Sequence, residues 1–122
     1  MRIWIDGSGA LLKGQKGMAC VVFDKNEPKV WYYGNATNNE MEYQALLNAL
    51  KDERSEKATV LTDSMLLVGQ LAKGWKVKAR NLLKLHKECL KLLKKRDAKI
   101  AWISRDENKA GKELERINPN IF

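Results

Sequence analysis

Residues 37–47 read Thr37-Asn38-Asn39-Glu40-Met41-Glu42-Tyr43-Gln44-Ala45-Leu46-Leu47 and follow a strand-rich N-terminal part of the chain. Their apolar residues recur at helical spacing, which predicts an amphipathic helix from about Asn38 to Lys51. Thr37 and Glu40 fit a capping box, in which each side chain satisfies a backbone N–H at the helix start. Glu42 has no such structural role and falls on the flank of the apolar stripe. A carboxylate that faces inward is costly unless a cation or hydrogen-bond donors meet it, so Glu42 is a candidate functional residue.

Two further acids follow apolar runs that are typical of buried strands. Asp6 closes the run Ile3-Trp4-Ile5, and Asp63 closes Ala58-Thr59-Val60-Leu61-Thr62. A carboxylate directly after a buried strand projects at the sheet edge where α/β folds place their ligand sites. Asp-Gly and Asp-Ser also favour ordinary turns, but coincidence at both positions beside an inward Glu42 is the weaker explanation.

The rest of the chain predicts an α/β fold. Strands are expected at 1–6, 18–23, 29–33, 58–62 and 99–103, with turns at 7–9 and 24–28. Further helices are expected at about 64–73, 79–95 and 108–116. Short connections between the first three strands favour an antiparallel meander. The order βββαβααβα describes a mixed sheet covered by helices, and no linker or repeat divides it, so residues 1–122 are expected to form a single domain.

The positive charge of the chain is concentrated in one segment. The formal net charge is +8, and residues 73–99 contain eleven Lys or Arg against only Glu88 and Asp97. The local excess of nine is larger than the net charge, so the remainder is close to neutral. A localised basic face suggests a polyanionic partner, whose phosphates lysine and arginine neutralise independently of sequence. The alternative is a solvated helix face, the usual fate of lysine runs.

Several classes of protein are disfavoured by what the sequence lacks. No apolar run approaches the roughly 20 residues that cross a membrane, and the N-terminus enters a strand without the features of a signal peptide. Cys20 and Cys89 lie in apolar contexts without a CxxC or metal-type neighbour. Buried free thiols in a reducing compartment are therefore favoured over a disulfide. We expect a cytoplasmic monomer with no protein partner.

Three carboxylates without a Cys or His cluster favour Mg²⁺ or Mn²⁺ over zinc. Two such ions about 4 Å apart can activate a water and stabilise the leaving oxygen of an in-line displacement. Together with a basic face, this indicates phosphodiester hydrolysis. Gly7-Ser8-Gly9 is too short for a P-loop and lacks its Lys-Ser/Thr pair. The single histidine, His86, is interpreted as a core residue. It lies on the predicted apolar stripe of the helix at 79–95, which consists of Leu82, Leu83, His86, Cys89, Leu90 and Leu93.

Three segments together resemble the main motifs of ribonuclease H type 1. They are Ile5-Asp6-Gly7-Ser8, Thr37-Asn38-Asn39-Glu40-Met41-Glu42-Tyr43 and Leu61-Thr62-Asp63-Ser64. The resemblance implies a ribonuclease H-like fold, with a mixed sheet of three antiparallel strands followed by two parallel ones and flanking helices. It also implies hydrolysis of the RNA strand of RNA/DNA hybrids to 5′-phosphate and 3′-hydroxyl ends, with Mg²⁺ or Mn²⁺ in a two-metal mechanism.

The resemblance assigns roles to individual residues. Asp6, Glu42 and Asp63 would be the metal-binding catalytic carboxylates. Asn38 and Asn39 would contact the hybrid in its minor groove, where the 2′-OH distinguishes RNA from DNA. The other expected substrate contacts are Gly7, Ser8, Ser64, Lys76, Lys78, Arg80 and Arg105. Asn38 and Asn39 could also simply cap the helix, which is compatible with a contact to substrate.

The fourth acid of the family departs from the pattern. Arg105-Asp106-Glu107-Asn108 keeps the segment that precedes it, but Lys112 stands at the matching position, and a lysine cannot coordinate Mg²⁺. The carbonyl oxygen of Asn108 is the preferred substitute, with Glu107 or Glu113 as alternatives. A neutral ligand would hold the second metal more weakly, so we expect a raised metal requirement or a preference for Mn²⁺.

Two other features set this chain apart. Residues 74–80 form only a short basic connector, similar to family members that lack the basic handle, with Trp75 expected to pack beneath Lys76, Lys78 and Arg80. The loop before the last helix lacks the histidine that assists product release in some members, a role that Arg105 could take. The rival functions are a catalytically weakened or inactive module that binds hybrid or double-stranded RNA, and hydrolysis of double-stranded RNA as a side activity.

Overall fold

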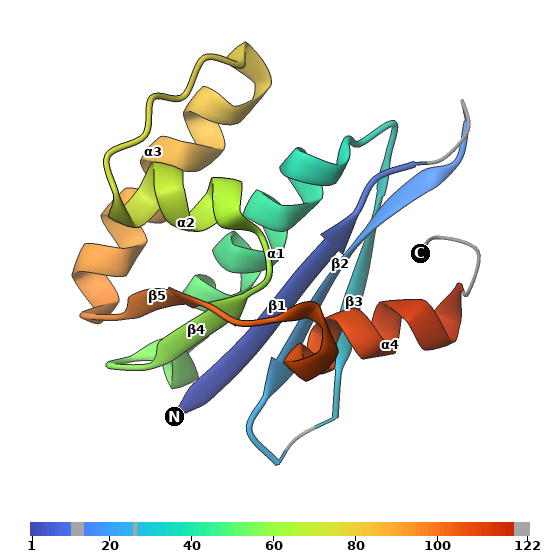
Figure 1. The fold of residues 1–122 in the computed structure, drawn as a ribbon, viewed down its shortest axis with the longest axis horizontal. Helices are drawn as coiled ribbons and strands as arrows, with labels where there is room; N and C mark the ends of the chain where they lie inside the picture. The colour runs from blue at the N-terminus through green and yellow to red at the C-terminus, as the bar shows by residue number, and fades with distance from the viewer. Residues whose placement is uncertain (11–13, 26, 119–122) are drawn as a thin grey trace.

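The computed structural model describes residues 1–10, 14–25 and 27–118, which contain a mixed β-sheet with the strand order β3-β2-β1-β4-β5 (Figure 1). The strands of this sheet are β1 (Arg2–Ser8), β2 (Lys16–Phe23), β3 (Lys29–Gly34), β4 (Thr59–Thr62) and β5 (Lys99–Trp102). β1 pairs antiparallel with β2, and β2 pairs antiparallel with β3. β4 runs parallel to both β1 and β5. The predicted mixed sheet is confirmed.

Four α-helices flank the sheet in the described part of the chain. They are α1 (Asn38–Lys51), α2 (Met65–Ala72), α3 (Arg80–Arg96) and α4 (Lys109–Ile117). Short 3₁₀ turns at Glu53–Ser55 and Arg105–Glu107 precede β4 and α4. No helix among residues 1–10, 14–25 and 27–118 has the length and apolar character needed to span a membrane.

Alternation along the strands produces a separate apolar cluster on each face of the sheet. Ile3, Ile5, Val21 and other residues of one face pack against the apolar stripe of α1, which α3 covers in turn. Trp4, Met18, Cys20 and Val22 of the other face pack against Ala110 and Leu114 of α4. In Figure 1, α4 accordingly lies apart from the other three helices. Asp6 has the same parity as Trp4 and therefore belongs to the α4 face.

The structure confirms the start of α1 and corrects the end of β1. The Thr37 hydroxyl accepts a hydrogen bond from the Glu40 N–H, and the Glu40 carboxylate accepts one from the Thr37 N–H, which is the predicted capping box. The prediction that Gly7–Gly9 turns out of the first strand was wrong for Gly7 and Ser8. Both residues remain in β1, where Gly7 pairs with Ala19 and Ser8 with Met18.

The structure also tests the predictions made for His86, for the two cysteines and for the apolar stripe of α3. His86, predicted to be a core residue, is only half-buried. Its ring lies edge-on to Tyr43 and contacts the Gln70 carbonyl oxygen through Nε2. Cys20 and Cys89 are both buried and free, as expected. The predicted apolar stripe of α3 was wrong at Leu83 and Leu90, which are 48% and 41% exposed. The buried line of α3 runs instead through Leu82 and Cys89.

Candidate active site

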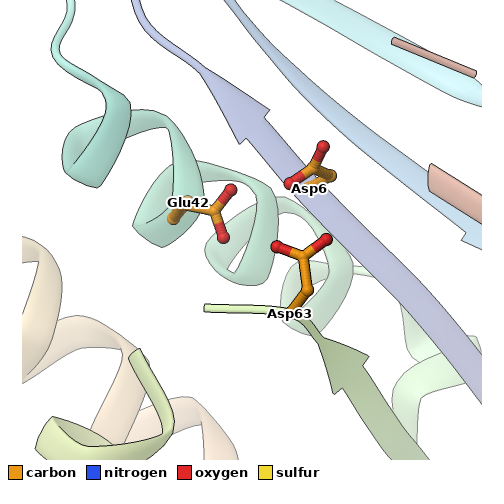
Figure 2. Close-up of side chains that lie close together, drawn as sticks. All are labelled: Asp6, Glu42 and Asp63. Carbon is orange, nitrogen blue, oxygen red and sulfur yellow. The ribbon is translucent and has the colours of Figure 1, made fainter. Parts of the chain in front are cut away.

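Three carboxylates from three separate elements converge at one point (Figure 2). Asp6 extends from β1, Glu42 from the second turn of α1, and Asp63 from the residue that follows β4. One carboxylate oxygen from each lies within 4.8 Å of the others, so these oxygens could hold a metal ion together. The structure thus brings together all three acids that the sequence singled out.

Strand register explains why the two aspartates meet. β1 and β4 are parallel neighbours, and Trp4 lies opposite Leu61. Asp6 comes two residues after Trp4, and Asp63 comes two residues after Leu61. The two aspartates therefore lie opposite each other on the same face of the sheet. The short β4 ends at Thr62, so the backbone at Asp63 is free to leave the sheet and present its carboxylate to Asp6.

Gly7 allows Glu42 to join the two aspartates. A Cβ atom at Gly7 would lie 2.2 Å from the Met41 carbonyl carbon and 2.4 Å from the Glu42 backbone nitrogen. Any side chain at position 7 would therefore push α1 away from β1. With glycine there, the Gly7 N–H donates a 2.7 Å hydrogen bond to Glu42 Oε1, and the Thr62 hydroxyl lies 3.4 Å from Oε2. Glu42 is thus fixed in position by the protein before any ligand binds.

The cluster is electrostatically unfavourable on its own. The pKa of Asp6 is raised to about 6, chiefly by burial and also by the neighbouring charge of Asp63. A hydrogen bond with Glu42 and the charge of Arg105 lower this pKa, but their effect is smaller. Burial and the charge of Asp6 also raise the pKa of Glu42 well above its ordinary value. Asp6 is only 1% exposed, and its Oδ2 atom has no hydrogen-bond partner among the described residues. Buried carboxylates that lack compensation fit a bound divalent cation, whose charge reverses this penalty.

The Asn108 side chain forms hydrogen bonds on both sides of its amide group. Its Nδ2 donates to the Ile5 carbonyl oxygen at 2.9 Å and to Asp63 Oδ2 at 3.1 Å. Its Oδ1 accepts from the backbone N–H groups of Ala110, at 3.0 Å, and Gly111, at 3.4 Å, and so caps α4. Exchanging the amide oxygen and nitrogen would set donor against donor and acceptor against acceptor. In this structure the Asn108 carbonyl oxygen is turned away from the carboxylates, and its amide group donates to Asp63.

The alternative fourth ligands are also directed elsewhere. Glu107 is exposed and accepts a 3.0 Å hydrogen bond from the Ser104 hydroxyl, and Glu113 forms an ion pair with Arg116. Neither belongs to the group of acids that could share a metal ion in the described part of the chain. Gly111 of α4 lies beside the cluster, because a Cβ there would be 3.3 Å from Asp6 Oδ2. Lys112 is exposed to solvent.

Two contacts of Asp63 were missing from the sequence prediction. Arg105 Nη1 lies 3.6 Å from Asp63 Oδ2, so the arginine expected to bind substrate phosphate also pairs with a member of the cluster. The Trp102 indole N–H donates a 3.2 Å hydrogen bond to the Asp63 carbonyl oxygen. Trp102 is itself 50% exposed. No local pattern marks these contacts, because they depend on how β5 and the following turn pass beside β4.

Among the expected substrate-binding residues near the cluster, the Asn38 and Ser64 side chains form hydrogen bonds within the protein. The Asn38 side chain accepts a 2.5 Å hydrogen bond from the Gly9 N–H, and Asn39 is exposed at the start of α1. The Ser64 hydroxyl accepts from the Leu67 N–H at 3.1 Å and caps α2, a role the sequence prediction did not include. Ser8 Oγ is buried and has no partner among the described residues.

The basic connector at residues 74–80 lies between α2 and α3. Lys76, Lys78 and Arg80 are all exposed. The Trp75 ring packs on Gly69, where an added Cβ would lie 2.0 Å from the ring carbon Cε3. This contact anchors the connector to α2 and leaves its three cationic side chains in solvent. Their contact with a nucleic acid remains a prediction.

Comparison with known proteins agrees with this geometry. The RNase H family model matches residues 1–113. The bifunctional protein Rv2228c of Mycobacterium tuberculosis (strain H37Rv) is 34% identical over 112 residues, an alignment that covers 84% of this chain. The chain spans only 31% of the length of that protein.

Solved structures agree on the fold. The N-terminal RNase H domain of Rv2228c is 28% identical, with a TM-score of 0.76 over 98% of this chain and 91% of that one. RNase H1 from Halobacterium salinarum NRC-1 has a TM-score of 0.79 over 97% of both chains at 22% identity. LC11-RNase H1 in complex with an RNA/DNA hybrid is 26% identical, with a TM-score of 0.76 over 93% of this chain and 91% of that one. The chain therefore belongs to the ribonuclease H family.

Proposed function

We propose that this protein hydrolyses the RNA strand of RNA/DNA hybrids endonucleolytically, in a reaction that requires Mg²⁺ or Mn²⁺ and yields 5′-phosphate and 3′-hydroxyl ends. The observation that carries the proposal is the cluster of Asp6, Glu42 and Asp63, with oxygens within 4.8 Å of one another and a buried Asp6 oxygen that has no partner among the described residues. Family membership adds the substrate class.

Asp6, Glu42 and Asp63 are the residues that would hold the metal. When bound, Mg²⁺ or Mn²⁺ supplies an activated water and neutralises charge on the phosphate. The chain contributes a preorganised site, because the Gly7 N–H orients Glu42 and the Asn108 amide orients Asp63. Burial of Asp6 and Glu42 limits the water that competes for the same oxygens. The two-ion arrangement implied by the resemblance lacks its acidic ligand from α4, where Lys112 stands.

Recognition of the hybrid is assigned to two exposed regions. Asn38 and Asn39 lie at the start of α1, four and three residues before Glu42, where their amides can reach base edges and 2′-hydroxyls in a minor groove. Lys76, Lys78 and Arg80 would bind phosphates of the DNA strand. Replacing all three by alanine should weaken hybrid binding. The slope of the logarithm of the binding constant against the logarithm of salt concentration should also become shallower, by about 0.9 for each phosphate that is no longer neutralised. An unchanged slope would exclude the connector from the interface.

The test is cleavage of an end-labelled RNA/DNA hybrid beside matched single-stranded RNA, duplex DNA and double-stranded RNA. Each substrate is incubated with Mg²⁺, Mn²⁺ or chelator, and the RNA ends are identified by phosphatase and ligase treatment. The protein should cut only the hybrid, only with metal, and Asp63→Asn should abolish cutting while the exposed Asp106→Asn does not. Cutting in chelator, or equal cutting by Asp63→Asn, would refute the proposal.

A second function is favoured by one observation, the absence of an acidic residue at Lys112. A catalytically weakened module would bind the hybrid as tightly in chelator as in metal and would leave it intact. Double-stranded RNA cleavage at a rate similar to hybrid cleavage would instead identify a broader ribonuclease. The same panel of substrates separates these outcomes.

A further inference from the structure

The side of the carboxylate cluster that faces α4 is lined by hydrogen-bond donors. Asn108 Nδ2 lies 3.1 Å from Asp63 Oδ2, and Arg105 Nη1 lies 3.6 Å from the same oxygen. Gly111 of α4, where a Cβ would lie 3.3 Å from Asp6 Oδ2, has no side chain to offer. The next residue, Lys112, is exposed and carries an ammonium group, which has no lone pair for a metal ion.

Donors on this side are unsuited to a second metal ion. A divalent cation needs oxygen lone pairs, and neither a guanidinium nor an amide NH₂ group provides any. A second ion placed between Asp6 and α4 would also meet the positive charge of Arg105, which is near enough to lower the pKa of Asp6. The same donors are well suited to an anion, because the planar fork of arginine matches the oxygens of a phosphate.

We propose that the site holds a single divalent ion, bound by Asp6, Glu42 and Asp63, and that the guanidinium of Arg105 supplies the second positive charge by contacting a non-bridging oxygen of the scissile phosphate. This inference rests on the proposed function. The Arg105 side chain is 47% exposed, so it can turn from Asp63 towards a bound phosphate without leaving a packed interior. In the free protein, Arg105 partly neutralises Asp63; in the complex, the metal takes over that role.

Metal stoichiometry tests the inference without any substrate. The protein is titrated with Mn²⁺, and free Mn²⁺ is followed by electron paramagnetic resonance. The native chain should bind one ion. Arg105→Ala should also bind one ion, roughly two- to five-fold more tightly, because a partly exposed competing cation has been removed from Asp63. Two ions in the native chain, or weaker binding by Arg105→Ala, would overturn the inference.

A second set of variants addresses the position on α4. Lys112→Asp combined with Arg105→Ala introduces an acid and removes the cation, so this double variant should gain a second Mn²⁺ ion. Lys91→Asp combined with Arg105→Ala makes the same charge change on α3, where Lys91 is exposed, and should stay at one. A second ion in the control pair, or none in the Lys112→Asp pair, would contradict the proposed geometry.

Hybrid cleavage supplies the complementary readout for Arg105. At saturating Mn²⁺, Arg105→Ala should lower kcat at least tenfold with a smaller change in KM, and Arg105→Lys should restore part of the loss. Unchanged kcat in Arg105→Ala would remove the arginine from the reaction. If the native chain cuts the hybrid and binds two ions, only this inference fails; if it binds one ion and cuts nothing, the proposed function fails.

Discussion

Replacing Asp6 by asparagine should stabilise the metal-free protein while abolishing its activity. The pKa of Asp6 is raised from 3.8 to about 6 in the fold, chiefly by burial. Its ionisation therefore opposes folding, and stability is lost as the pH rises between these two values. Each unit of pKa difference corresponds to about 1.4 kcal/mol. Above pH 6 the ionised Asp6 therefore lowers the free energy of unfolding of the native chain by about 3 kcal/mol, and an uncharged asparagine has no such effect.

The assay is thermal unfolding in chelator between pH 5 and pH 8. The stability advantage of Asp6→Asn should grow as the pH rises from 5 and reach about 3 kcal/mol at pH 8. This advantage corresponds to roughly 10 °C in Tm for a domain of this size. Asp106→Asn, on an exposed turn, serves as the matched control and should shift stability by less than about 0.5 kcal/mol.

Added metal should reduce the stability difference between Asp6→Asn and the native protein. Mg²⁺ should bind the native cluster more tightly than the variant, and an ion that binds only the folded state stabilises that state by mass action. The gap between Asp6→Asn and the native protein should therefore narrow as Mg²⁺ is added. A variant less stable than the native chain in chelator at pH 8, or an advantage that does not change with pH, would refute the electrostatic account of the cluster.

Three further substitutions test the local geometry. Gly7→Ala would set a Cβ 2.2 Å from the backbone of α1. It should lower the free energy of unfolding by at least about 2 kcal/mol and reduce cleavage activity. Gly34→Ala is the control, because a Cβ there meets nothing within 4 Å, and it should change neither stability nor activity. Asn108→Asp removes a donor to the β1 backbone and adds a charge beside the cluster, so urea unfolding in chelator should show a loss of about 1–3 kcal/mol; tighter metal binding would instead make position 108 a ligand. Gly69→Ala should displace the Trp75 ring, red-shift tryptophan fluorescence and weaken hybrid binding, and an unchanged spectrum would contradict the packing of the connector.

The sequence was most informative where local signals and function coincide. Asp6 closes the apolar run of β1, Asp63 comes directly after β4, and the Thr37–Glu40 capping box marks the start of α1. Once these elements were assigned, Glu42 was the only acid of that helix without a structural role. Parallel pairing of β1 with β4 then required the two aspartates to meet. The cluster could be predicted because each member is defined by its own short segment.

The remaining features depend on contacts between distant segments. The orientation of the Asn108 amide is set jointly by Ile5, Asp63 and the first turn of α4, and no local pattern reveals it. The extension of β1 through Ser8 likewise depends on pairing with β2, because Gly7-Ser8-Gly9 alone favours a turn. The exposed Leu83 and Leu90 show that apolar periodicity on α3 does not specify which residues its neighbours cover.

The central claim, that the Asp6, Glu42 and Asp63 cluster is the centre of metal-dependent hybrid cleavage, is tested most directly by two neighbouring glutamates on α1. Glu42→Gln and Glu40→Gln make the same chemical change two residues apart, one in the cluster and one in the helix cap. Single-turnover cleavage of an end-labelled RNA/DNA hybrid in Mn²⁺ should fall by at least 100-fold in Glu42→Gln and by less than threefold in Glu40→Gln. Equal rates in the two variants, or cleavage by Glu42→Gln at the native rate, would contradict the account.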